Sequence, residues 1–195
     1  MISLNRSAFI TGCLAIFLSA SAAAFEPPSD RDRKTPPVLS ATGTVQAAFT
    51  PGDDAGKLIA DAIHDAQRQV LVQTFSFTHR KIADALIAAK QRGVDVKVLA
   101  DKDQIHRIAT SLIPKIAAEG VPVFTDSEHA SAHNKVMVID AGSPEATLIT
   151  GSFNFTQAAQ YRNAENVLVI RNNAPLTNLY LKNWHRHYEH SRPYR

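Results

Sequence analysis

The stretch HNKVMVIDAGSPEATLITGSFNFT, residues 133–156, predicts two neighbouring strands joined by a loop. Apolar and β-branched residues dominate positions 135–139 and 147–150, which is typical of strands inside a sheet. Between them, residues 141–145 read AGSPE, and glycine, serine and proline favour a turn. We therefore expect a β-hairpin here.

Polar residues at the ends of this hairpin should face the same way in pairs. Because residues two apart in a strand share a face, His133 and Lys135 should project side by side, and so should Ser152 and Asn154. The alternate aromatic residues should point into the core; they are Phe153 and Phe155. An imidazole, an ammonium, a hydroxyl and an amide together suit a tetrahedral anion, and a phosphodiester is the obvious candidate. Gly151 would let a bulky phosphate approach the backbone.

Outside the hairpin, helical and strand patterns alternate along the chain. Helices are expected at 58–66, 82–89, 105–118 and about 175–190, and strands at 45–49, 70–77, 94–100, 121–124 and 166–170. Gly93 should end the second helix in the left-handed conformation, and Pro114 should bend or split the third. The fold class is therefore predicted as α/β, with a mixed, mostly parallel sheet flanked by helices on both faces.

Residues 1–24 have the layout of a secretory signal peptide. Arg6 precedes an apolar run at 8–18, and small residues lead to a cleavage site after Ala24. A retained membrane helix is the second choice, and a lipoprotein signal cut at Cys13 has too short an apolar stretch. Cleavage after Ala24 removes the one cysteine and leaves no stable membrane span. We expect a periplasmic or secreted bacterial protein.

Residues 25–43 form a linker rich in proline and charge, which cannot bury enough apolar surface to offset its ordering entropy. The folded domain is expected at 44–195. With 45% hydrophobic and 20% charged residues, the 195-residue chain has the composition of one globular domain. Its net charge of +3 is compatible with a polyanionic partner and equally with ordinary surface charge.

Two motifs carry a resemblance to a known family. The pattern His-x-Lys-x4-Asp at 133–140, followed by Gly-Ser-x-Asn at 151–154, resembles the signature of the phospholipase D superfamily. From residue 45 to the C-terminal helix, the chain is similar to the small secreted bacterial endonucleases of that superfamily, which carry one motif per chain and work as dimers. Ten residues separate Asp140 from Gly151, more than in the family pattern, and the turn residues between them can absorb the excess.

The resemblance implies a role for each site residue. His133 matches the nucleophile that attacks phosphorus and forms a phosphohistidine, which water then hydrolyses. Lys135 and Asn154 match the residues that hold the non-bridging oxygens, and Ser152 matches a supporting hydroxyl. Glu165 matches the carboxylate that orients and charges the imidazole. These residues neutralise the phosphate by themselves, so neither a metal ion nor a cofactor is expected in the reaction.

Two motif residues are expected to be structural. Asp140 has the opposite parity from His133 and Lys135, so its side chain should point away from the phosphate and accept hydrogen bonds that pin the loop. Gly151 completes the structural part of the motif.

The mechanism needs a second histidine to protonate the leaving oxygen. The segment His79-Arg80-Lys81 cannot supply it, because position 86 is leucine and the segment should open a helix. A two-fold homodimer that brings two copies of His133 to one cleft would solve this.

Other histidines do not suggest a metal site from sequence. His129 lies four residues before His133, but its loop is not convincingly helical and no third ligand is well placed. The run WHRHYEH at 184–190 is expected to be a basic, solvated helix end that could contact nucleic acid phosphates.

Three functions are compatible with these residues. The first is a metal-independent, non-specific endonuclease acting on DNA, with RNA as a possible second substrate. The second is a phospholipase D that hydrolyses phosphatidyl head groups, although the sequence shows no amphipathic or aromatic membrane-docking segment. The third is a non-catalytic nucleic-acid-binding module.

Overall fold

The structure is a computed structural model that describes residues 35–195. The expected signal peptide at 1–24 and most of the linker at 25–43 lie outside the described residues. Residues 35–43 contain no helix or strand, and the first strand begins at Thr44.

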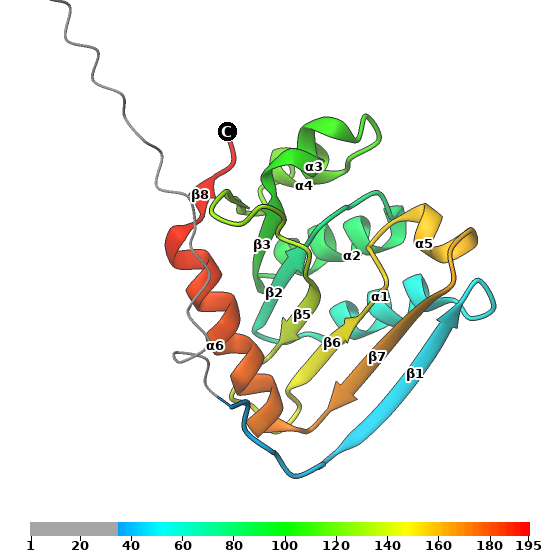
Figure 1. Cartoon of the computed structure of the whole chain (residues 1–195), viewed down its shortest axis with the longest axis vertical. Helices are drawn as coiled ribbons and strands as arrows, with labels where there is room; N and C mark the ends of the chain where they lie inside the picture. Colours follow the sequence, from blue (N-terminus) through cyan, green and yellow to red (C-terminus); the bar gives the residue numbers. More distant parts are fainter. Residues whose placement is uncertain (1–34) are drawn as a thin grey trace, which may run out of the picture. The chain divides into compact units, whose positions relative to one another are not determined.

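The centre of the domain is one eight-stranded sheet with the order β1-β7-β6-β5-β2-β3-β4-β8 (Figure 1). Its strands are β1 (Thr44–Thr50), β2 (Gln69–Thr74), β3 (Asp95–Asp101), β4 (Val123–Asp126), β5 (Lys135–Ile139), β6 (Thr147–Gly151), β7 (Glu165–Arg171) and β8 (Arg192–Pro193). The pairs β2–β3 and β3–β4 are parallel, and the other five are antiparallel. The mixed α/β sheet is thus confirmed, but the expectation that it is mostly parallel is wrong. Crossover helices join only β2, β3 and β4, whereas β5 and β6 are connected directly in a hairpin, which requires antiparallel pairing.

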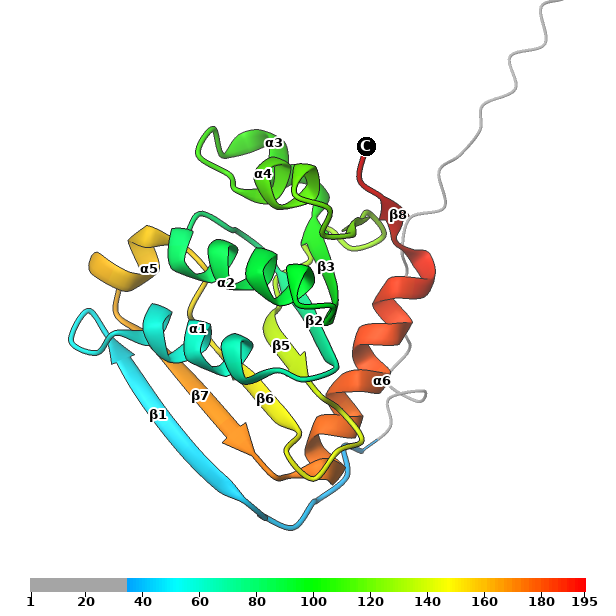
Figure 2. The same ribbon diagram turned by 180° about the vertical axis from the view of Figure 1, so that it is seen from behind.

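Helices cover both faces of the sheet, as predicted. They are α1 (Ala55–Asp65), α2 (Arg80–Gln91), α3 (Lys102–Arg107), α4 (Ile113–Ala118), α5 (Gln157–Tyr161) and α6 (Ala174–His190). Helices α1 and α2 pack on one face (Figure 2), and α6 crosses the other (Figure 1). The expected helix at 105–118 is split into α3 and α4, with Pro114 in the first turn of α4, where a missing N–H costs nothing. Gly93, shortly after the end of α2, has φ of +90°, as the expected left-handed helix stop requires.

The continuous apolar run of β2 follows from its position between two cores. Val70 and Val72 pack with α1 and α2, while Leu71 packs with Trp184 of α6 on the opposite face. The Trp184 indole N–H also donates to the carbonyl of Val72 at 3.1 Å. Each such apolar side chain stabilises the fold by about 1.5–3 kcal/mol. Among the described residues, no helix is long and apolar enough to cross a membrane.

The predicted hairpin is formed by β5 and β6, with Val136 opposite Thr150 and Ile139 opposite Thr147. Its loop begins at Asp140, which has φ of +48°. The hairpin places the start of β5 beside the end of β6, and both strands lie in the middle of the sheet. This fixes where the motif residues lie.

Candidate active site

His133 and Lys135 lie side by side, as the strand parity predicts. Lys135 is the first residue of β5 and is buried, whereas His133 just before the strand is exposed. The Lys135 ammonium donates to Nδ1 of His133 at 2.9 Å and to the His133 carbonyl at 2.6 Å. The lysine therefore holds both the ring and the backbone of the candidate nucleophile.

An aromatic ring completes this cluster, and we did not predict it as a site residue. Phe75 follows β2, and the centroid of its ring lies 4.4 Å from that of His133 and 5.0 Å from the Lys135 ammonium. This places the cation within range of a cation–π interaction. A signal existed in the sequence: QTFSFT at 73–78 echoes TGSFNFT at 150–156, and the structure joins the two segments by a parallel bridge between Phe77 and Phe155.

The ammonium of Lys135 is destabilised by its surroundings. Burial lowers the pKa of Lys135 to about 8, and the charge of Glu165 opposes this only in part. A buried cation that lacks full compensation is well suited to bind an anionic group that arrives from solvent.

Glu165 lies in a second cluster at the start of β7. The Ser152 hydroxyl donates to Oε2 of Glu165 at 2.6 Å, and the Asn163 amide donates to Oε1 at 3.0 Å. The Ser152 oxygen in turn accepts the backbone N–H of Asn166 at 3.0 Å. Within the described chain, Glu165 makes no hydrogen bond to His133, so the expected contact between this carboxylate and its own imidazole is not formed.

Gly151 is required by the packing of the sheet. Its φ is +152°, and a Cβ at this position would lie 2.3 Å from the carbonyl oxygen of Asn166 on β7. The close approach is therefore to protein backbone, whereas we expected an approach by phosphate.

Asn154 is half-buried, and its Oδ1 is buried without a hydrogen-bond partner in residues 35–195. A buried amide oxygen without a partner is uncommon in proteins, and it leaves hydrogen-bonding capacity unused at the end of β6. Phe153 and Phe155 on either side are each 1% exposed, so they point into the core as predicted.

Asp140 occupies the structural position that its parity predicts. Its two carboxylate oxygens accept backbone N–H groups from Gln67, Arg68 and Gln69, each at 2.8 Å. The side chain thus ties the β5–β6 loop to the segment that leads into β2, away from His133.

His79 is separate from the site. It occupies the N-cap position of α2 without a capping hydrogen bond from its side chain. The ring is buried against Gly56, and burial lowers the pKa of His79. The helix begins directly at Arg80, as expected for this segment.

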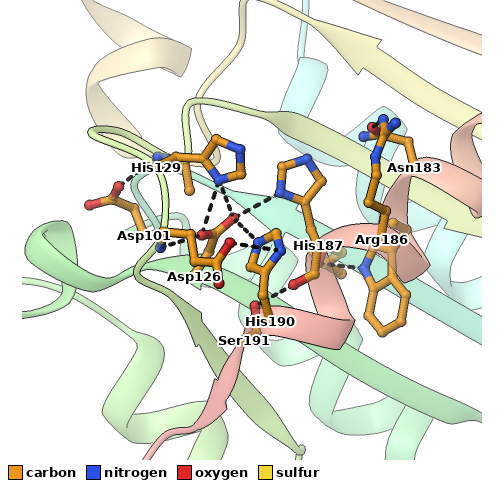
Figure 3. A network of polar contacts seen from close by, with 12 residues as sticks. Asp101, Asp126, His129, Asn183, Arg186, His187, His190 and Ser191 are labelled. Carbon is orange, nitrogen blue, oxygen red and sulfur yellow. Dashed lines mark hydrogen bonds and ion pairs between the residues drawn. The ribbon is translucent and has the colours of Figure 1, made fainter. Parts of the chain in front are cut away.

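The histidines that we did not expect to form a metal site are gathered in space (Figure 3). His129, His187 and His190 converge on the buried carboxylate of Asp126. The expectation that no third candidate ligand is well placed near His129 is therefore wrong, and so is the expectation that 184–190 is only a solvated helix end. Burial by itself would raise the pKa of Asp126, but contacts with His187, His129 and His190 more than offset this and lower it.

Comparisons with known proteins agree with the family resemblance that the motifs indicate. The family model described as "Cardiolipin synthase, PLD-like domain" matches residues 59–188. A phospholipase D of Rickettsia bellii (strain RML369-C) is 40% identical over 140 residues, which cover 72% of this chain and 67% of that protein. A mitochondrial cardiolipin hydrolase of Chlamydomonas reinhardtii is 33% identical over 110 residues, covering 56% of this chain and 47% of that one. Nuc from Salmonella typhimurium, described as a phospholipase D family member, has a crystal structure that matches with a TM-score of 0.72 and 37% identity, covering 79% of this chain and 99% of that chain.

Proposed function

The chain belongs to the phospholipase D superfamily of phosphodiester hydrolases, and on that premise we propose that it is a non-specific endonuclease that cleaves DNA, and secondarily RNA. The observation that carries the choice of substrate is the match to Nuc over 99% of that chain, in agreement with the resemblance to the small endonucleases of the superfamily. The exposure of His133 and Ser152 supports it, because a polymer backbone must reach the site without entering a deep pocket.

The reaction we propose has two displacements. Nε2 of His133 attacks phosphorus and expels one ester oxygen, which takes a proton from a second imidazole. Water then attacks the phosphohistidine, gives a proton to that second imidazole and frees Nε2 of His133. Lys135 holds the non-bridging oxygens, and Asn154, whose Oδ1 lacks a partner, is free to turn its amide N–H₂ toward them. Lys135 and Asn154 supply the stabilisation of the phosphate, so no metal ion takes part in the chemistry.

The contact between Lys135 and His133 supports the proposal that a single chain lacks part of the site. An ammonium can only donate, so Nδ1 of His133 accepts, and a neutral ring then carries its proton on Nε2. The attacking nitrogen needs a lone pair, so Nδ1 must exchange the ammonium for an acceptor. An incoming phosphate would draw the ammonium of Lys135 away and leave Nδ1 to a carboxylate.

We propose that a homodimer supplies the missing groups. A two-fold axis at the site would bring a second His133 to protonate the leaving oxygen. It would also bring a second Glu165. The His133 imidazole, which has no carboxylate hydrogen bond among residues 35–195 of its own chain, would take one from the other copy. Sedimentation of the purified protein tests this: an active, strictly monomeric chain would rule out the shared site.

A phospholipase D activity is the second candidate, because the relative in Rickettsia bellii is named a phospholipase D. The chemistry at phosphorus would be the same, and only the groups attached to the phosphate would differ. We also propose that the protein is exported to the periplasm or beyond, with residues 1–24 removed; the N-terminal residue of the recovered protein, expected to be Phe25, tests this.

In the deciding experiment, the purified protein is incubated with plasmid DNA and, separately, with phosphatidylcholine and cardiolipin vesicles, each with and without excess chelator. We expect plasmid cleavage, which should fall by about 1,000-fold or more in His133→Ala. The exposed His64 on α1 provides the matched control, and His64→Ala should cleave as the parent does. Hydrolysis of vesicles with intact plasmid would replace the endonuclease by the phospholipase, and binding of DNA without any hydrolysis would favour the non-catalytic module.

A further inference from the structure

A second cluster of chemically active side chains lies outside the site described above. Asp126 ends β4, His129 follows in the loop toward β5, and His187 and His190 lie in the last turns of α6. Figure 3 shows the three imidazoles pointing inward around the Asp126 carboxylate. We propose that these four residues bind one divalent transition-metal ion, and that zinc is the ion they fit best.

The distances support a common ligand for all four groups. Oδ2 of Asp126 lies 2.8 Å from Nδ1 of His187, 3.2 Å from Nδ1 of His129 and 3.2 Å from Nε2 of His190. The four candidate ligand atoms all lie within 4.8 Å of one another. A tetrahedral zinc ion with bonds of about 2.0–2.1 Å separates its ligand atoms by about 3.3 Å. Small side-chain rotations are sufficient to close the cluster around one ion.

Hydrogen bonding alone accounts poorly for this arrangement. All three imidazoles crowd around one carboxylate, with His187 and His190 at Oδ2 and Nδ1 of His129 at 3.2 Å from both oxygens. Nε2 of His190 is buried, yet within the described residues it forms no hydrogen bond of acceptable geometry. A cation between the rings would use the lone pairs of all three imidazoles and the charge of the carboxylate together.

The ligand types select the class of metal. Imidazole nitrogen suits zinc and its neighbours, whereas calcium and magnesium prefer sites made of oxygen alone. Three nitrogens and one carboxylate oxygen complete a tetrahedron and leave no open position, which is typical of structural zinc sites. The exposed fraction of the Asp126 side chain is 2%, and those of the histidines range from 13% to 31%, so the site is shielded but reachable.

The position of the cluster indicates what the metal does. It would join the end of α6 to the loop that runs from Asp126 to His133. The same loop is held by Asp101, whose carboxylate accepts the backbone N–H of Ala132 at 2.8 Å. The ion would therefore stabilise the C-terminal helix and the approach to the candidate nucleophile, and it takes no part in the reaction at phosphorus.

Metal content of the purified full chain is the first test. We expect one equivalent of zinc per chain by mass spectrometry of the metal, and its loss in the double variant His187→Ala/His190→Ala. His185 lies on the same helix but is exposed and outside the cluster, so His185→Ala should keep the metal. Added zinc should raise the melting temperature of the stripped parent and of His185→Ala, but not that of the double variant. Metal content no higher in the parent than in the double variant would overturn the site.

A cobalt titration of the stripped parent keeps the test independent of whether the double variant folds. One equivalent of Co²⁺ should produce the intense visible absorption of a four-coordinate ion and then saturate. Absence of that absorption, or weak absorption without an end point, would overturn the proposal. Neither measurement depends on plasmid cleavage, so failure of the metal site and failure of the proposed endonuclease are separate results.

Discussion

Replacing Lys135 by methionine should stabilise the protein while removing its activity. Methionine keeps most of the length and the apolar stem of lysine but carries no charge. Lys135 is only 7% exposed, and among the described residues its ammonium has no hydrogen-bonded carboxylate partner. The fold therefore carries an electrostatic cost at this position, which only the substrate would compensate.

The pKa of Lys135 gives the size of this cost. A fall from 10.5 to about 8 corresponds to about 3 kcal/mol against the charged form in the folded state. Lys135→Met also loses the donation to the His133 carbonyl and the contact with Phe75, together worth about 1–2 kcal/mol. The variant should thus gain about 1–2 kcal/mol in free energy of unfolding at neutral pH.

The dependence on pH has a definite sign. Because the folded-state pKa lies below the unfolded value, folded protein loses the lysine proton near pH 8 while unfolded chain keeps it to about 10.5. The parent therefore gains stability as pH rises between these values, and Lys135→Met does not. Urea unfolding at fixed protein concentration, at about pH 7 and about pH 10, should show the advantage of the variant shrinking.

A matched control separates this effect from general loss of surface charge. Lys81 is exposed and pairs with Asp54, so Lys81→Met should change stability by no more than about 0.5 kcal/mol at either pH. If Lys135→Met were less stable than the parent at neutral pH, or if its advantage did not depend on pH, the buried charge would not be the cost inferred here.

Asp140→Ala leaves three backbone N–H groups without their carboxylate, so unfolding in urea should show a loss of about 2–4 kcal/mol; a loss below about 1 kcal/mol would show that water replaces the carboxylate. Gly151→Ala places a Cβ against the Asn166 carbonyl, and thermal unfolding should reveal a loss of about 1–3 kcal/mol, whereas unchanged stability would mean that β7 shifts without strain. Trp184→Phe removes the donor to the Val72 carbonyl and part of the core beneath α6, and a loss of about 1–3 kcal/mol is expected by urea unfolding; a neutral result would contradict the packing of α6.

Local patterns in the sequence predicted the elements well but the strand directions poorly. Apolar periodicity gave the alternation of helices and strands, and AGSPE at 141–145 gave the β5–β6 hairpin. The direction of a strand depends on which neighbour it pairs with, and apolar periodicity carries no such information. The runs that implied burial on both faces are equally compatible with antiparallel strands covered by helices, as β5, β6 and β7 show.

The candidate site was predictable where it depends on strand parity. His133 beside Lys135, the inward Phe153 and Phe155, and Asp140 pointing away from His133 all follow from alternation along the two segments of the hairpin. Glu165 lies on another strand, and its contact with Ser152 depends on the β6–β7 register, which alternation cannot supply.

The histidine cluster was missed for a similar reason. Asp126 and His129 are three residues apart, and so are His187 and His190, so each half presents a pair of ligands from one turn. What no local pattern shows is that β8 follows α6 and pairs with β4, which brings the end of the helix back beside Asp126. The signal available in the sequence was that both pairs have the same three-residue spacing.

The segment between the two clusters indicates how His133, the proposed nucleophile, can be held in place although it is exposed. Residues 127–134 form no helix or strand, so His133 cannot rely on a hydrogen-bonded ladder for its position. Its position depends on three contacts. Lys135 donates to its carbonyl, Phe75 packs against its ring, and Asp101 accepts the backbone N–H of Ala132, the residue before it. The ammonium of Lys135 must leave the ring when it binds phosphate, and one of these three restraints weakens at that moment. A metal ion at His129 would anchor the other end of the segment independently of the phosphate, so the nucleophile would keep its position while its lysine binds the phosphate.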